Sequence, residues 1–93
     1  RIFIFTPKGD VIDLPKDSSV IDFAYAIHTD IGAHVASAKV NGKFSAITTK
    51  LQSGDRVEVE TKKNAKPNKK WIESCKTTMA KRRINNYLEN TKT

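Results

Sequence analysis

Short apolar runs separated by turn residues dominate the first part of the chain. Ile2-Phe3-Ile4-Phe5 and Val11-Ile12-Asp13-Leu14 are rich in β-branched and aromatic residues, and each run predicts a strand. Thr6-Pro7-Lys8-Gly9 lies between them, with proline second and glycine fourth as in a type I turn. The pattern therefore predicts an N-terminal hairpin, which Pro15 ends.

A helical pattern follows this hairpin. Apolar residues recur at the 3.6-residue period and predict a helix over residues 20–28, and Gly32 is expected to end the helical region. Ser19 and Asp22 have the spacing of a capping box, here with the shorter acid. The stripe expected to be buried consists of Val20, Phe23, Ala24, Ile27 and Ile31.

Three more strands are predicted after the helix. Residues 35–40 form an apolar run, Asn41-Gly42 is typical of a type I′ hairpin turn, and residues 44–47 return. Residues 56–60 alternate apolar and charged side chains, as in a strand with one buried face. The order predicts an α+β fold: a β-grasp sheet of about five strands with one packed helix. A ferredoxin-like fold would need a second helix before Thr61, which the pattern does not predict.

The last third of the chain predicts two helices after a polar connector. Asn68 is the expected N-cap of the first helix, and Thr77 or Thr78 of the second. We therefore divide the chain into a β-grasp domain, residues 1–62, and a linker with a basic helical segment, residues 63–93. The apolar positions expected to pack are Trp71, Ile72 and Cys75 in the first helix and Ala80, Ile84, Tyr87 and Leu88 in the second.

Charge is distributed unevenly between these two parts. Residues 1–61 carry seven Lys/Arg and eight Asp/Glu, whereas residues 62–93 carry ten Lys/Arg and two Asp/Glu. A cationic segment of this kind favours phosphate backbones or acidic protein surfaces, although a plain solvated helix face gives the same pattern. Lys81, Arg82 and Arg83 are its candidate RNA contacts, and we expect them to be exposed.

Known catalytic and cofactor patterns are missing from the sequence. His28 and His34 are six positions apart with no cysteine near them, so no metal site is predicted. Gly42-Lys43 lacks the other residues of a phosphate-binding loop, and no G-x-S-x-G string is present. We therefore expect no catalytic residues and no cofactor.

Cellular context can be inferred only in outline. No apolar run approaches the roughly 20 residues that cross a bilayer, so we expect no membrane partner. The single cysteine, Cys75, is expected to be a small core residue and is compatible with the cytoplasm. The chain starts at Arg1 and has no initiating methionine, so we interpret it as a piece of a longer protein.

Several strings resemble one family. FTPKGDVIDLP (residues 5–15), VIDFAYAIHTDIG (20–32), AKVNGK (38–43) and LQSGD (51–55) are similar to the TGS domain of long RelA/SpoT-type enzymes, which make or degrade (p)ppGpp. PNKKW and the TTMAK helix start resemble the segment that follows this domain in the family. Ser37, where the family tends to have glycine, and residues 45–48 depart from the pattern.

The resemblance implies a regulatory role for a chain that is not itself an enzyme. It implies a parent protein with synthetase and hydrolase domains before Arg1, acting as GTP pyrophosphokinase, (p)ppGpp hydrolase or both. It also implies that the domain senses the 3′ CCA end of an uncharged tRNA on a starved ribosome. In the family this contact falls on the histidine of the AIHTD string, which is His28 here.

The residues themselves leave alternatives open. Tyr25 and His28 are three positions apart on one helix flank and could stack on and hydrogen-bond an unpaired base. Alternatively, His28 could cap the helix by bonding a free carbonyl, and Tyr25 could be part of the core with only its hydroxyl in water. His34 is expected to be plain surface. The alternative function is protein docking, to the parent's own catalytic domains or to an acidic carrier such as acyl carrier protein.

Overall fold

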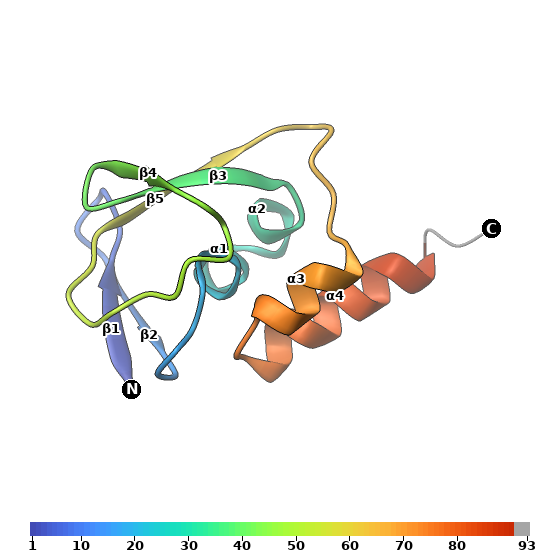
Figure 1. The fold of residues 1–93 in the computed structure, drawn as a ribbon, viewed down its shortest axis with the longest axis horizontal. Helices are drawn as coiled ribbons and strands as arrows, with labels where there is room; N and C mark the ends of the chain where they lie inside the picture. Colours follow the sequence, from blue (N-terminus) through green and yellow to red (C-terminus); the bar gives the residue numbers. More distant parts are fainter. Residues whose placement is uncertain (91–93) are drawn as a thin grey trace.

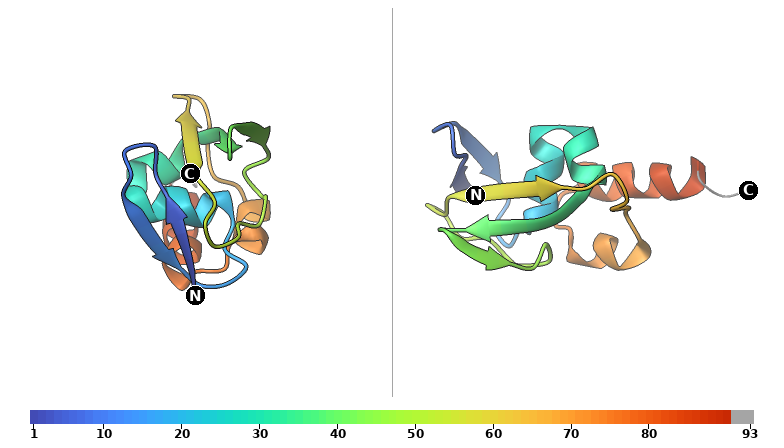
Figure 2. Two further views of the ribbon diagram at one scale, coloured as in Figure 1. Left: turned by 90° about the vertical axis from the view of Figure 1, so that its left-hand side faces the viewer. Right: turned by 90° about the horizontal axis from the view of Figure 1, so that it is seen from above.

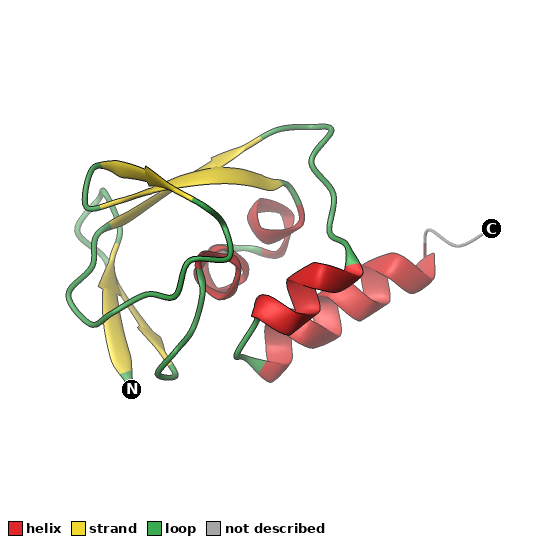
Figure 3. Ribbon diagram, in the orientation of Figure 1, coloured by secondary structure: helices red, strands yellow, loops and turns green. Residues whose placement is uncertain are grey.

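The computed structural model describes residues 1–90. Two short sheets lie over a group of helices (Figures 1 and 3). Strands β1 (Ile2–Phe5) and β2 (Val11–Leu14) form the predicted N-terminal hairpin, with Phe5 opposite Val11. Strands β3 (Val35–Val40), β4 (Lys43–Ser45) and β5 (Val57–Thr61) form a second sheet in the order β4-β3-β5. The two sheets together make up the α+β architecture predicted from the sequence.

A parallel contact joins the two sheets where β1 meets the start of β5. Phe5 forms a parallel bridge with Arg56, and its N–H donates to the carbonyl of Asp55 at 2.9 Å. The five predicted strands are thus divided between a two-stranded and a three-stranded sheet, which this short pairing joins. The contact brings the first and last strands together, as a β-grasp requires and as sequential hairpins do not.

One element of the β-grasp region was not predicted. Helix α1 (Val20–Ile27) is followed directly by a second, short helix, α2 (Thr29–Ala33). Between them His28 is extended, with φ −166° and ψ 145°, so the helix stops there and restarts. Gly32 lies inside α2 and does not end a single long helix, so this prediction was wrong. Because α2 has only five residues and follows α1 directly, it adds no second crossover to the sheet.

The buried surface of α1 is wider than the predicted stripe. Val20, Phe23 and Ala24 are fully buried as expected, but Ile27 is 37% exposed because the helix ends there. Ile21, Asp22 and Tyr25 of α1 are also buried. Asp22 and Tyr25 lie against the C-terminal segment, which covers a flank that a single sheet would leave in water.

Turn chemistry agrees with the sequence, whereas one strand boundary does not. Asn41 and Gly42 have φ values of 54° and 85°, which confirms the type I′ turn. The strand expected over residues 44–47 is β4 and covers only Lys43–Ser45. Ile47 has left the sheet, and its carbonyl accepts the N–H of Ile21 at the start of α1.

The C-terminal segment forms helices α3 (Lys69–Ser74) and α4 (Thr78–Asn90), capped by the predicted residues. The Asn68 side chain accepts the N–H of Trp71, and Thr77 Oγ1 accepts the N–H of Ala80. Four side chains of this segment are buried in one cluster with the β-grasp core: Trp71, Cys75, Ala80 and Ile84. The division at residues 62/63 therefore separates two sequence segments that share one core. No helix among residues 1–90 is long and apolar enough to span a membrane.

Candidate nucleic-acid interface

His28 lies at the junction between α1 and α2, which we call the elbow (residues 27–33). Its N–H donates to the carbonyl of Ala24 at 3.2 Å, and its own carbonyl accepts the N–H of Gly32 at 3.0 Å. The ring nitrogen Nδ1 accepts the N–H of Asp30 at 3.1 Å. His28 does cap a helix, but it satisfies an N–H of α2. The expected bond to a free carbonyl of α1 is not the one observed.

This arrangement fixes the chemistry that His28 offers to a ligand. Because Nδ1 is an acceptor, the neutral ring carries its proton on Nε2. The side chain is 64% exposed, so Nε2–H is available as a hydrogen-bond donor. The elbow thus presents one oriented donor and one aromatic face in water, the groups that recognise an unpaired nucleotide.

Two lysines of the connector lie beside the elbow. The structure has a depression of about 300 Å³ here, lined by Asp30, Ile31, His34, Thr61, Lys62 and Lys63. His34 holds the connector in place: its carbonyl accepts the N–H of Lys62 at 3.0 Å, and its Nδ1 lies 3.0 Å from the carbonyl of Ala65. The expectation that His34 is plain surface was therefore wrong. Sequence reasoning also missed Lys62 and Lys63, since local patterns do not show that the connector returns to α2.

Tyr25 does not share the surface of His28. The residue is 4% exposed, and its buried hydroxyl has no hydrogen-bond partner among residues 1–90. A Cβ atom on Gly32 would lie 2.4 Å from the Tyr25 ring, so α2 packs directly on that ring. Burial, followed by nearby Cys75 and Tyr87, raises the pKa of Tyr25 to about 12. The expectation of a wet hydroxyl was wrong, because α3 and α4 cover this flank of α1.

The basic residues of α4 are exposed as predicted, but they do not form one surface. Successive helical residues point about 100° apart, so three in a row diverge. Arg82 and Arg83 line one depression together with Thr78, Met79 and Asn86. Lys81 lines a different one together with Asp17, near the N-terminal end of α1. His28 lies at the other end of α1, so Lys81 and the elbow are separate candidate contacts.

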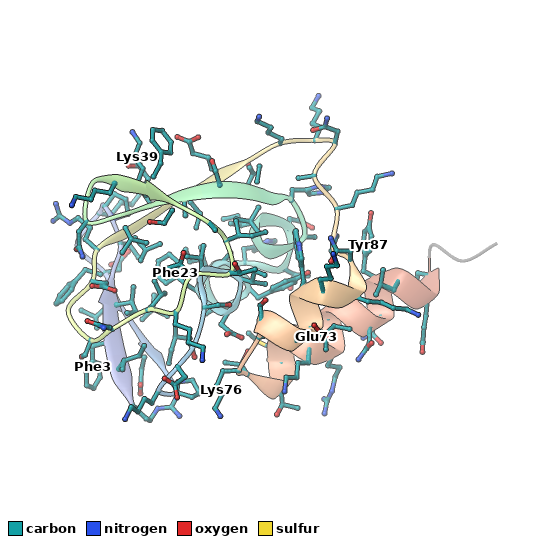
Figure 4. All side chains as sticks on the ribbon, viewed as in Figure 1. Phe3, Phe23, Lys39, Glu73, Lys76 and Tyr87 are labelled. Carbon is teal, nitrogen blue, oxygen red and sulfur yellow. The ribbon has the colours of Figure 1, made fainter. Side chains whose placement is uncertain are left out.

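A further exposed surface lies on the outer face of the sheets. Phe3 and Val11 are about half exposed, and Phe44 is 71% exposed with Lys39 Nζ 4.8 Å from its ring centroid. Phe3 and Lys39 lie on the outside of the strands, whereas Phe23 lies between strands and helices (Figure 4). We call Phe3, Phe5, Val11 and Phe44 the outer apolar face. The strand pattern predicted exposed faces without showing that four apolar side chains occupy them.

The titratable side chains do not form a metal site in the described part of the chain. Residues 1–90 contain no cluster of three His, Cys, Asp or Glu side chains that could hold a metal ion. Cys75 is 5% exposed, as expected for a core residue. Burial, and secondarily the neighbouring Asp22 carboxylate, raises the pKa of this thiol to about 12, so it is a poor nucleophile at neutral pH.

Comparison with known proteins identifies the β-grasp region. The model of the TGS domain family matches residues 2–61. The chain belongs to the TGS domain family. It is 46% identical over 89 residues to a GTP pyrophosphokinase of Myxococcus xanthus. It is 44% identical over 89 residues to a guanosine-3′,5′-bis(diphosphate) 3′-pyrophosphohydrolase of Aquifex aeolicus. It is 47% identical over 90 residues to the bifunctional (p)ppGpp synthase/hydrolase RelA of Mycobacterium tuberculosis.

These alignments cover nearly the whole chain and a small part of each relative. They span 95–96% of this chain and 12–13% of the relatives' lengths. The similarity therefore continues past residue 61 into the C-terminal helices. The resemblance to the TGS domain of RelA/SpoT-type proteins is confirmed, as are the β-grasp fold and the assignment of this chain as a non-catalytic domain.

Proposed function

We propose that this chain is the regulatory RNA-binding module of a (p)ppGpp synthetase/hydrolase of the stringent response. In this proposal it senses the 3′ CCA end of an uncharged tRNA on the ribosome, in the cytoplasm. The parent carries the GTP pyrophosphokinase activity, the (p)ppGpp hydrolase activity or both. The observation that carries the proposal is the exposed, oriented ring of His28 at the elbow.

The elbow has the groups that a free RNA end needs. The Nε2–H of His28 is a suitable donor to a ribose hydroxyl or a base edge, and its ring face can stack on the last base. Lys62 and Lys63 supply positive charge for the neighbouring phosphates. The depression beside the elbow has a volume of only about 300 Å³, which fits a single-stranded end better than a duplex.

The same groups explain why a charged tRNA is a poor ligand. An esterified amino acid occupies a terminal ribose hydroxyl and adds a positively charged α-ammonium group. Lys62 and Lys63 lie beside the elbow, and their positive charges repel that ammonium group. Discrimination between uncharged and charged tRNA thus follows from steric exclusion and from like charge at one site.

A titration of the isolated chain tests this proposal. The probe is a short RNA hairpin ending in single-stranded ACCA-3′OH, and its partner is the same RNA with an amide-linked amino acid at the 3′ end. NMR amide shifts should move at the elbow and at Lys62 and Lys63, and the aminoacylated RNA should bind at least about fivefold more weakly. Shifts confined to α4, or equal binding of both RNAs, would contradict the proposal.

Protein docking is a second candidate function, and the outer apolar face favours it. Phe3, Phe5, Val11 and Phe44 are apolar side chains exposed on strands of both sheets, and apolar surface of this kind is suited to contact with a protein partner. The partner would be the parent's own catalytic domains or an acidic carrier protein. A Phe3→Ser/Phe44→Ser double variant should weaken such a complex and leave RNA binding at the elbow unchanged. Loss of RNA binding in this variant would instead assign the outer face to RNA.

A further inference from the structure

Helix α1 is enclosed on two sides. The strands cover one side, and the α3–α4 pair covers another (Figures 1 and 2). Buried side chains of α1, α3 and α4 belong to one cluster. The helix that ends in the elbow is therefore also the helix against which the C-terminal segment packs.

The Asp22 carboxylate makes the first connection between α1 and α4. It is fully buried, and its Oδ2 accepts the N–H groups of Ser19 at 2.9 Å and Lys76 at 2.8 Å. Its Oδ1 accepts the N–H of Thr77 at 3.0 Å and the Thr77 hydroxyl at 2.8 Å. Thr77 in turn caps α4 by accepting the N–H of Ala80. One carboxylate thus holds the first turn of α1 against the start of α4.

Tyr25 makes the second connection, one turn further along the same flank of α1. One side of its ring contacts Gly32 of α2, where even a methyl group would come within 2.4 Å. The ring is buried in one cluster with Cys75, Ala80 and Ile84 of the C-terminal segment. Within residues 1–90 the buried hydroxyl has no hydrogen-bond partner, so the packing at this place leaves a polar group unsatisfied.

We propose that α1 couples the elbow to α4, with Tyr25 and Asp22 as the positioning residues. A ligand that displaces α2 moves Gly32 against the Tyr25 ring, and the ring displaces the α3–α4 pair. Asp22 fixes the start of α4, so α4 turns about that end as a unit. Only the identity of the ligand rests on the function proposed above, because the coupling itself is a property of the packing. By linkage, a partner that binds α4 changes the affinity of the elbow for its ligand. The factor is the same as the one by which that ligand changes the affinity of α4 for the partner.

Amide hydrogen exchange of the whole chain tests the coupling without any ligand. Gly32→Ala places a methyl group against the Tyr25 ring, whereas Thr29→Ala changes an exposed residue of the same short helix. In Gly32→Ala the amides of α4 should exchange at least about tenfold faster relative to those of β3 and β5. Thr29→Ala should leave this ratio unchanged. If β3, β5 and α4 all accelerate equally, the variant is merely less stable and the coupling is wrong.

A second measurement uses the ACCA-3′OH hairpin as the probe and the unmodified chain. Chemical-shift changes at the buried side chains of Ala80 and Ile84 in α4 that saturate together with those at His28 support the coupling, because these side chains cannot touch the RNA. Changes at His28 with none at Ala80 and Ile84 overturn the coupling and leave the proposed function standing. If no changes occur at His28, the proposed function fails, and the Gly32→Ala exchange ratio still decides the coupling by itself.

Discussion

Replacement of Asp22 by asparagine should detach the C-terminal helices from α1. The asparagine side chain keeps one oxygen acceptor. In place of the other it has an NH₂ group, which faces hydrogen-bond donors that the second carboxylate oxygen of Asp22 accepts in the unmodified chain. If that group faces Thr77, the hydroxyl can reorient but the Thr77 N–H stays buried without an acceptor. One such orphaned group costs about 1–3 kcal/mol, and the loss of charge-assisted bonds adds to this. We expect a loss of about 2–4 kcal/mol from a total stability of about 5–14 kcal/mol.

The buried Trp71 offers a direct assay, because it is the only tryptophan and it lies in α3. Urea unfolding followed by its fluorescence should show a midpoint lowered by about 1–3 M in Asp22→Asn. Asp13→Asn is the matched control. That carboxylate pairs with Arg1 at the surface, so its loss should change stability by less than about 1 kcal/mol. If both variants unfold at the midpoint of the unmodified chain, Asp22 does not hold α4 in place.

Three further predictions test the core and the basic face. Cys75 should react with a disulfide reagent at pH 8 far more slowly in the folded chain than in urea. Burial raises the pKa of this thiol to about 12, so on raising the pH the thiol ionises first in the unfolded chain. The contribution of the buried neutral thiol to folding stability is therefore complete below about pH 9 and declines as the pH rises toward 12. Comparison of urea unfolding with Cys75→Ala across this range measures the effect. Ile84→Ala should cost about 2–5 kcal/mol in the same assay, against less than about 1 kcal/mol for exposed Met79→Ala. An Arg82→Ala/Arg83→Ala variant should reduce the salt slope of RNA affinity by about 1.4–1.8, and an unchanged slope would assign these residues to protein contacts.

Local signals in the sequence predicted local structure well. Asn41-Gly42 forms a type I′ turn because both residues tolerate positive φ, and Asn68 and Thr77 cap the helices that follow them. The capping-box spacing placed the start of α1 correctly, since the Asp22 carboxylate accepts the Ser19 N–H. These features depend on residues that lie within a few positions of one another.

Features that depend on distant residues were not predicted. The apolar periodicity of residues 20–28 predicted one buried stripe. No pattern near these residues indicates that helices some fifty residues later cover Tyr25 and Asp22. The second helix was missed because histidine is not among the preferred N-cap residues, although His28 Nδ1 performs that role here. Of the candidate site residues, His28 and the α4 cations are exposed as expected, whereas Tyr25 is part of the core.

The central claim is that His28 reads the free 3′ end of tRNA, and activation of the full-length parent on ribosomes tests it most directly. (p)ppGpp synthesis would be measured with uncharged tRNA in the A site for the unmodified protein, His28→Glu and Gln52→Glu. Gln52→Glu is the control, because it adds the same charge at an exposed position in a depression that neither the elbow nor α4 lines. Loss of one stacking contact costs about 1–3 kcal/mol, so activation by tRNA should weaken roughly 5- to 150-fold in His28→Glu only. Normal activation of a normally folded His28→Glu protein would contradict the claim.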